Sequence, residues 1–569
     1  MVLEVLTIIA AGRSSLIKPV LGVGIPLLIL YFVSGGFILY LNSVLIAIVS
    51  TPVIKLAVEI GILSLASFLV VRAVYREVAS DSLKAFLITV FLIVGLYSLT
   101  DLWLFILVST LALITVLLAS PPHLGRREKA LLISGLAVSY TALVILSLYT
   151  PIDSGARIEV VDIPRAIDVN GLARFIPLMT AYVYAVDRIQ VPGYSIYPGD
   201  AYVYFFNMSL VYSWAIEPYT IWNRLFRGPV GVAIVHGDSY PPNVEIIQRD
   251  MVWGLRNMRF QGYIDDLYRE VVLNVCIYCR PILNNAPVTV YRGEILVLIP
   301  IVAWDRGLLY SIPILKGYAV VHQNGSIEAL TPLEAMRDPR FSGIPLVPEQ
   351  VAREWAELVR HRVGFLEYYI FQRTFMIRDV GENPQPYLTI DGNGNSWWVF
   401  VAEPSGEVYS AKYILYINTS TLKPSIYIYT LQQPAIGVSR VESYVKQIYP
   451  QYDWSQLRVE EPIPVILNGT IYWKATVVTN DYRGLVSVVL IDAKTGQART
   501  ISLADRKSLS YVDAMNTLIQ GGVGGIEKEG RQDIVKRIEN LEKLIQSLRS
   551  YLDELEKELE ELKRQIGGG

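Results

Sequence analysis

The sequence contains few of the residues that build metal or redox centres. Its 569 residues include two cysteines and four histidines, and its formal net charge is −2. Four histidines leave little material for a metal site, and a net charge near zero does not favour nucleic acid as a partner. A P-loop, a GxGxxG fingerprint and a GxSxG nucleophile elbow are all absent. We therefore expect no catalytic residue, no cofactor and no nucleic-acid partner, and we predict that the chain is not an enzyme.

Long apolar runs are concentrated before Thr150. Each is long enough, at about 17–25 residues per span, to cross a bilayer as a helix. We place spans near residues 16–34, 37–53, 54–71, 84–99, 102–119 and 130–150. Five spans are the alternative, because Thr51-Pro52 is the one break between the second and third runs. The lipid bilayer is therefore a predicted partner.

Cationic residues are unevenly distributed among the connections between these runs. Short loops that carry lysine or arginine stay in the cytoplasm, and two connections carry most of these residues: Arg72, Arg76 and Lys84 at one, and Arg126, Arg127 and Lys129 at the other. Residues after Thr150 would then be exterior, and the predicted localisation is the cell membrane, multi-pass. The N-terminal stretch carries Glu4 and no cationic n-region, so we expect no cleavable signal.

The polar region 151–519 contains every N-x-[ST] sequon of the chain. Such asparagines are glycosylated only on exterior surfaces, so their position agrees with the orientation of the spans. We predict glycosylation at Asn207, Asn324, Asn418 and Asn468.

A repeated order of elements runs through this region. Its unit is an amphipathic helix, a strand with a tryptophan, and a strand that ends in a polar turn. The last copy reads SRVESYVKQIYPQYDW, NGTIYWKATVV and LVSVVLIDAKTGQA; earlier copies begin with PEQVAREWAELVRHRV, EIIQRDMVWGLRNMRF and, more weakly, GLARFIPLMTAYVYAV. Alternating apolar residues in the strands would pack one sheet face on the helix. We therefore predict an α+β domain of tandem units.

The last copy, residues 441–500, resembles the PepSY domain. The second half of that domain has a strand with tryptophan or tyrosine and then a strand ending in D-A-x-T-G, as IYWKATVV and VVLIDAKTGQA do here. The upstream copies resemble it loosely and lack this turn. PepSY-like modules are small α+β units of protease propeptides and membrane-anchored exterior proteins. The resemblance implies a binding or inhibitory module, and it brings no catalytic residue.

The two cysteines form a CxxC motif, Cys276-Ile-Tyr-Cys279. A redox motif would need a thioredoxin-like βαβ context, and a zinc site would need a second pair of ligands. A local disulfide in an oxidising exterior is therefore the prediction, with redox chemistry or a metal as alternatives.

One stretch has the oxygen spacing of a calcium loop. Asp391, Asn393 and Asn395 place side-chain oxygens at alternate positions. Ser396 and Ala402 stand where an EF-hand has glycine and the bidentate glutamate, so a Gly-rich turn is the alternative. We make no firm metal assignment and keep these residues as a weak calcium candidate.

The C-terminal residues follow heptads after a Gly-rich linker at 520–533. In 534–566 every a and d position is isoleucine or leucine: Ile534, Ile538, Leu541, Ile545, Leu548, Leu552, Leu555, Leu559, Leu562 and Ile566. This spacing predicts a left-handed coiled coil, with a single helix lying on the exterior domain as the alternative. We predict a homo-oligomer through this segment and leave the number of strands open.

Together these features predict a multi-domain fold in three parts. An α-helical polytopic membrane domain would occupy 1–150, the α+β exterior domain of tandem PepSY-like units 151–519, and the coiled coil 534–566. The predicted function is that of a membrane-anchored cell-surface protein that acts by binding, with an exterior protein as a possible partner, or by multimeric assembly. One alternative is a transporter or channel with an exterior sensory domain, for which Lys55 and Glu59 are the one charged pair in the spans. The other is a membrane-tethered regulator of exterior proteases.

Overall fold

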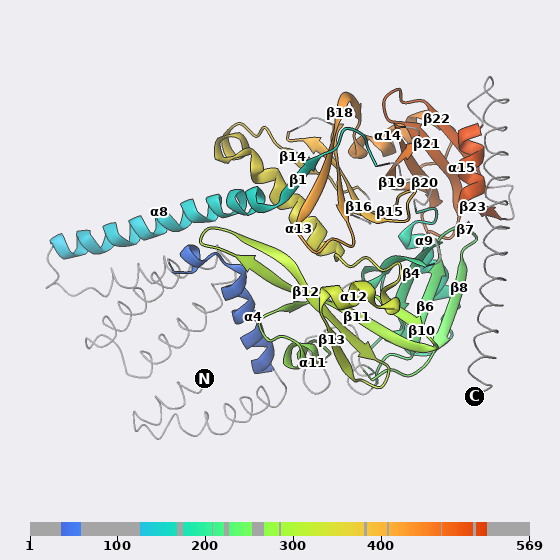
Figure 1. The fold of residues 1–569 in the computed structure, drawn as a ribbon. Coiled ribbons are helices and arrows are strands. Elements are labelled where there is room, and N and C mark those ends of the chain that lie inside the picture. Colours follow the sequence, from blue (N-terminus) through green and yellow to red (C-terminus); the bar gives the residue numbers. More distant parts are fainter. Residues whose placement is uncertain are drawn as a thin grey trace, which may run out of the picture. The chain divides into compact units, whose positions relative to one another are not determined.

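Most elements in the described part of the chain are β-strands (Figure 1). The computed structural model describes residues 36–57, 126–167, 174–206, 209–220, 223, 227–252, 267–283, 286–380, 384–406, 409–467, 469–503 and 508–520. The chain divides into two units, Met1–Tyr511 and Val512–Gly569. Within the described residues, the first unit contains four sheets of four or more strands.

The first sheet is antiparallel, in the order β3-β4-β6-β8. Its strands are β3 (Tyr202–Phe206), β4 (Ser209–Ala215), β6 (Gly231–His236) and β8 (Asn243–Gln248). The helix α9 (Leu178–Arg188) precedes it and buries Thr180, Ala181 and Ala185. The helix predicted from EIIQRDMVWGLRNMRF is wrong at its start, because Glu245 to Gln248 belong to β8 and pair with β6.

The second sheet follows in the order β10-β11-β12-β13, with β9 also paired to β11. Its strands are β9 (Arg280–Pro281), β10 (Val288–Tyr291), β11 (Glu294–Arg306), β12 (Ser311–His322) and β13 (Ile327–Leu330). The helix α11 (Leu267–Asn274) precedes it, and α12 (Pro332–Arg337) follows behind a capping box of Thr331 and Glu334. Val211 and Val232 of the first sheet share one core with Leu298 and Val320 of the second.

The third sheet has the order β1-β18-β17-β16-β14, with β15 also paired to β16. Its strands are β1 (Glu159–Asp162), β14 (Phe375–Ile377), β15 (Tyr387–Ile390), β16 (Ser396–Pro404), β17 (Ser410–Asn418) and β18 (Ser425–Ile436). The helix α13 (Glu349–Val359) precedes β14. Its buried Trp355 donates from Nε1 to the Pro313 carbonyl of β12 at 2.7 Å, which joins α13 to the second sheet.

The fourth sheet is a meander of β19 (Leu457–Leu467), β20 (Thr470–Thr479), β21 (Leu485–Asp492) and β22 (Ala498–Ser502). The helix α14 (Val438–Ile448) precedes it. Val441 and Val445 of this helix form a core with Trp473 and Val489 of the sheet. The amphipathic pattern of SRVESYVKQI therefore has its apolar side against the strands.

The fourth sheet and the residues after it contact α9 and β7 (Ser239–Tyr240), two elements next to the first sheet in the sequence. Beyond the fourth sheet, β23 (Leu509–Ser510) pairs with β7. The Tyr240 hydroxyl accepts the backbone N–H of Leu485 at 3.3 Å, and the Tyr184 hydroxyl of α9 donates to the Arg483 carbonyl at 3.2 Å. A final helix, α15, spans Tyr511–Gln520.

The predicted membrane domain is contradicted by the described residues. No helix among them is long and apolar enough to cross a membrane. The predicted span 37–53 falls on α4 (Gly36–Ser50), whose 15 residues fall short of the roughly 20 that a span needs. The predicted span 130–150 falls on α8 (Arg126–Arg157), which contains Pro151 and has charged residues at both ends. The spans 16–34, 84–99 and 102–119, and most of 54–71, lie outside the described residues.

The reason is that these two helices pack on the sheets through polar groups. Asn42 of α4 donates to the Ile277 and Cys279 carbonyls at 2.8 and 3.0 Å, and Ser154 of α8 donates to the Ser311 carbonyl at 3.2 Å. The three-part fold class and the multi-pass cell-membrane localisation are therefore wrong, and the described chain is mainly β-sheet. The coiled-coil positions from Ile534 to Ile566 lie outside the described residues, so the homo-oligomer stays a prediction.

Candidate functional site

The segment after β8 and two hairpin turns of the second sheet border an open polar pocket. Its volume is about 470 Å³, within the range of small-molecule sites. The lining residues come from the end of β8, the β10–β11 turn and the β12–β13 turn: Arg249, Asp250, Arg292, Gly293, Glu294, Gln323 and Asn324. The pocket therefore presents two guanidinium groups, two carboxylates and two carboxamides on one surface.

Backbone hydrogen bonds fix the walls of this pocket. Arg292 and Gly293 both have positive φ, 51° and 83°, as a two-residue hairpin turn requires. The Val252 N–H donates to the Gln323 carbonyl at 3.3 Å, which holds the segment after β8 against the β12–β13 turn. A Cβ at Gly293 would lie 3.8 Å from Nη2 of Arg249, so the two arginines lie on neighbouring walls.

The charges in the pocket are unequally compensated. Within the described residues, neither the Arg249 guanidinium nor the Arg292 guanidinium has a hydrogen-bond or ion-pair partner, although the Arg292 guanidinium lies 5.3 Å from the centre of the Tyr291 ring. Glu294, in contrast, has an oxygen 3.0 Å from Nδ1 of His322. Both guanidinium groups of the pocket are thus without a direct side-chain partner in the described residues, whereas one of its two carboxylates contacts His322.

His322 belongs to a series of polar side chains next to the pocket that contact one another. Its Nε2 lies 3.6 Å from Glu328, which accepts a 2.7 Å hydrogen bond from Arg340. That hydrogen bond holds the pKa of Glu328 below its usual value. Arg340 also pairs with Asp338. This series of contacts fixes Glu294 at the edge of the pocket, so the pocket is a built feature of the second sheet.

A second group of charges is buried where the first, third and fourth sheets meet. Nη1 of Arg174 lies 3.6 Å from Glu461, with both side chains almost fully buried. Lys474 is fully buried and donates to the carbonyls of Arg174 and Phe175. Glu461 also accepts the backbone N–H of Leu178 at 2.8 Å. We call Arg174, Glu461 and Lys474 the buried charge cluster.

Burial shifts the pKa values in and around this cluster. It lowers the pKa of Lys474 to about 8, although Glu461 opposes the shift. Burial also opposes the charge of Arg174, but Glu461 raises the pKa of that guanidinium above its ordinary value. Desolvation raises the pKa of Glu349, at the start of α13, to about 7. Through these contacts the cluster connects the segment before α9 to β19 and β20.

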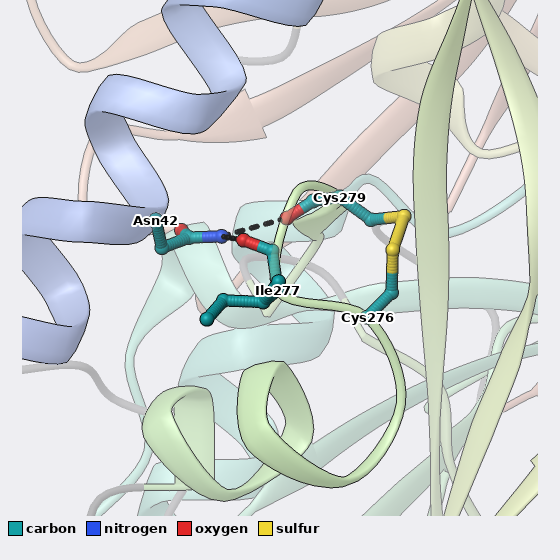
Figure 2. The surroundings of a disulfide bond; sticks show 4 residues. All are labelled: Asn42, Cys276, Ile277 and Cys279. Carbon is teal, nitrogen blue, oxygen red and sulfur yellow. Dashed lines mark hydrogen bonds between the residues drawn. A yellow bond between two sulfur atoms is a disulfide. The ribbon is translucent and has the colours of Figure 1, made fainter.

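The structure places Cys276 and Cys279 in a disulfide between α11 and β9 (Figure 2). The carbonyls of Ile277 and Cys279 in this loop accept the two hydrogen bonds from Asn42, and the Tyr268 hydroxyl donates to the Asn42 side chain at 2.8 Å. Through these hydrogen bonds α4 is attached to the disulfide loop and to α11. Among the described residues, no group of three or more His, Cys, Asp and Glu side chains is placed to hold a metal ion.

The calcium candidate is a hydrogen-bonded turn between β15 and β16. The Asp391 carboxylate accepts the backbone N–H groups of Asn393 and Asn395 at 2.8 and 2.9 Å. It also accepts side-chain hydrogen bonds from Asn395 and Trp397, both at 3.0 Å. The oxygens of Asp391 are thus engaged by its own turn, as in an Asx turn.

Two of the four sequons fall in described turns. Asn324 is exposed in the β12–β13 turn and lines the pocket, and its Oδ1 accepts from the Ser326 N–H at 2.9 Å. Asn418 ends β17, and its Oδ1 accepts from the Ser420 N–H at 2.8 Å. Asn207 and Asn468 lie outside the described residues. Glycosylation at all four stays a prediction.

Sequence reasoning missed both the pocket and the buried charge cluster. The pocket residues come from three turns that are distant in sequence, so no local spacing joins them. One signal was available for the cluster: Glu460-Glu461-Pro462 interrupts an apolar strand, and β19 has its register shift there, with Glu461 at a φ of 45°. A bulge of this kind re-aims a side chain.

Comparisons with known proteins identify no family. No protein-family model matches the sequence, and no curated protein matches it. One similar solved structure is a β-1,3-galactosidase of glycoside hydrolase family 43 with galactodeoxynojirimycin, at 12% identity and a TM-score of 0.18, over 53% of this chain and 75% of that one. Another is a glycosyl hydrolase from Bacteroides ovatus, at 11% identity and a TM-score of 0.15, over 59% and 79%.

These findings correct the functional predictions. With no described helix able to cross a membrane, the membrane-anchored cell-surface protein, the transporter or channel and the membrane-tethered protease regulator are all unsupported. Both similar structures are glycoside hydrolases, against the expectation that the chain is not an enzyme, and that expectation is withdrawn. Such low TM-scores assign neither a fold nor an activity to this chain.

Proposed function

We propose that this chain binds an anionic saccharide in the polar pocket of Arg249 and Arg292. The observation that carries the proposal is that two guanidinium groups without a described partner line one pocket of about 470 Å³. Guanidinium groups form paired hydrogen bonds with carboxylate or phosphate, and these are stronger than neutral ones. The ligand is therefore expected to carry one such group.

The other lining residues favour a ligand that also has hydroxyl groups. The Gln323 carboxamide can donate and accept, the Asn324 side-chain NH₂ group can donate, and the Asp250 and Glu294 carboxylates can accept from a hydroxyl. A bare inorganic anion would leave these groups without a role. A carboxylated or phosphorylated sugar satisfies both the cations and the acceptors, and one or two rings suit the volume of the pocket.

The test replaces both arginines with glutamine, which is shorter, uncharged and still polar. The double variant Arg249→Gln/Arg292→Gln should bind glucuronate at least about 10-fold more weakly, since a hydrogen bond to a charged group contributes about 1.5–3 kcal/mol. Affinities are measured by calorimetry on the full chain. The matched control Arg165→Gln/Lys423→Gln removes the same charge from exposed positions outside the pocket and should bind as the unmodified chain does. Equal losses in both variants would mean that only net charge matters, and no loss would place the ligand elsewhere.

We also propose that residues 441–500 form a PepSY-like unit, as the resemblance of their sequence implies. Support comes from the packing of α14 on the fourth sheet and from the turn after β21. Asp492 Oδ1 accepts the N–H groups of Lys494 and Thr495, both at 2.8 Å, and Gly496 has a φ of 73°. The D-A-x-T-G sequence would then serve to close this turn.

Replacement of Gly496 tests this role of the turn. Gly496→Ala should cost about 1–2 kcal/mol, because an L-residue is strained in the left-handed region. Hydrogen exchange should speed up at β21 and β22, which the turn connects. The control is Gly392→Ala, where a Cβ would meet nothing within 4 Å and φ is not in the left-handed range. Unchanged exchange at β21 and β22 in Gly496→Ala would count against the unit.

A further inference from the structure

An exposed apolar patch surrounds a π-helical turn that follows α13. The turn, η6, spans Leu366–Ile370. Four neighbouring side chains are largely exposed: Phe365 at 41%, Leu366 at 56%, Ile370 at 59% and Phe371 at 53%. Single exposed apolar residues are ordinary, but a contiguous group marks an interaction surface. π-helical turns are also frequent at functional sites. We call these four residues the η6 patch.

The η6 patch rests on an ordered support. The Tyr369 hydroxyl donates to the Leu148 carbonyl of α8 at 3.1 Å, and the Phe365 and Tyr369 rings lie 5.2 Å apart. The His361 and Tyr368 rings are 3.9 Å apart. These contacts leave the aliphatic and aromatic ends of the patch facing outward. Their exposure is therefore set by the fold.

Three arginines lie close in sequence to the η6 patch. Residues 360–373 contain Arg360, Arg362 and Arg373 against a single acid, Glu367. Arg360 pairs with Glu357 at 2.9 Å, and Arg373 lies 3.8 Å from Glu367. Arg362 is exposed and has no ion-pair partner within the described residues. The patch thus combines large apolar side chains with three arginines, of which Arg362 has no ion-pair partner in the described residues.

We infer that the η6 patch docks on an anionic lipid surface. Apolar side chains bordered by cations insert into the boundary between headgroups and acyl chains, and anionic headgroups strengthen the contact. A second copy of this chain fits less well, because two equal patches would bring their arginines together. The proposal concerns side chains that lie on the surface of a bilayer, and it requires no helix that crosses one.

A label at the patch tests the inference on the full chain. The two native cysteines are joined to each other, so a single introduced cysteine can be labelled. We use Leu366→Cys and, in a second protein, Ile370→Cys, each with an environment-sensitive fluorophore. Vesicles of mixed phosphatidylglycerol and phosphatidylcholine should shift the emission to the blue, brominated acyl chains should quench it several-fold, and salt should weaken both effects. A label at Leu422→Cys, a 40% exposed residue in the β17–β18 turn, is the control and should not respond.

Three results would overturn the inference. One is a patch label that responds to vesicles no more than the label at position 422. Another is an equal response to vesicles of phosphatidylcholine alone, since the arginines would then have no role. The third is a shift that grows with protein concentration without vesicles, which would assign the patch to contact between copies.

Discussion

Replacing Glu461 with glutamine is expected to lower the free energy of unfolding by about 3–5 kcal/mol, the cost of removing one partner from a buried ion pair. Glutamine has nearly the same shape and can still accept the N–H of Leu178, so the packing is retained. What is lost is the negative charge that Arg174 and Lys474 face, in a region where neither can reach water. Urea unfolding followed by fluorescence measures the effect.

Two further variants separate charge from packing. Arg483→Gln removes the arginine of an ion pair whose side chains are 62% and 52% exposed, and it should leave the unfolding midpoint nearly unchanged. Glu461→Gln/Lys474→Met removes one charge of each sign and should recover part of the stability lost in Glu461→Gln. The effects of substitutions at neighbouring residues on the free energy of unfolding are not additive. A Glu461→Gln protein as stable as the unmodified chain would show that the cluster does not hold the sheets together.

Lys474 should make the protein more stable as the pH rises above 8. Its pKa is about 8 in the folded state against an ordinary value of 10.5. Between these values the unfolded chain binds more protons than the folded one, so the free energy of unfolding increases with pH. By pH 9.5 the gain from this one lysine is about 2 kcal/mol. Below pH 8 the lysine is charged in both states, and the cost of burying that charge remains.

The measurement is the difference between the unmodified chain and Lys474→Met from pH 6.5 to 9.5. This difference cancels the titration of other groups, including buried tyrosines. The difference in free energy of unfolding should not change with pH below about pH 7. Above that pH it should increase in favour of the unmodified chain. Lys423→Met, at an exposed turn, provides a comparison whose difference should stay flat throughout. A flat difference for Lys474→Met as well would mean that this lysine is not desolvated.

Local sequence pattern predicted several helices correctly. It failed where contacts between distant residues determine the structure of a segment. The helix expected from PEQVAREWAELV is α13, and SRVESYVKQI is α14, because in each the apolar residues recur at helical spacing. NVEIIQ is a strand at the edge of the first sheet, since its exposure alternates along β8 and its backbone pairs with β6. Apolar runs near Asn42 and Ser154 suggested membrane spans, but hydrogen bonds to residues more than 150 positions away fix α4 and α8.

The residues of the pocket and of the buried charge cluster could not be predicted from local pattern for the same reason. Arg249 and Arg292 line one pocket only because the fold brings two distant segments together. Arg174 and Glu461 form an ion pair only because the fold brings β19 next to the segment before α9. The disulfide of Cys276 and Cys279, in contrast, involves residues three apart, so spacing alone could suggest it. The sequence shows that Arg249 and Arg292 are charged, but it does not show that they line the same pocket.

Calorimetric titration of the full chain with three sugars tests whether the pocket of Arg249 and Arg292 binds an anionic saccharide. Glucuronate carries a carboxylate, glucose 6-phosphate carries a phosphate, and glucose carries no charged group. We expect heat of binding for at least one of the two anions, no measurable binding of glucose at the same concentrations, and weaker anion binding as salt is added. Binding of glucose as tight as that of the anions, or no binding of any of the three, would contradict the proposal.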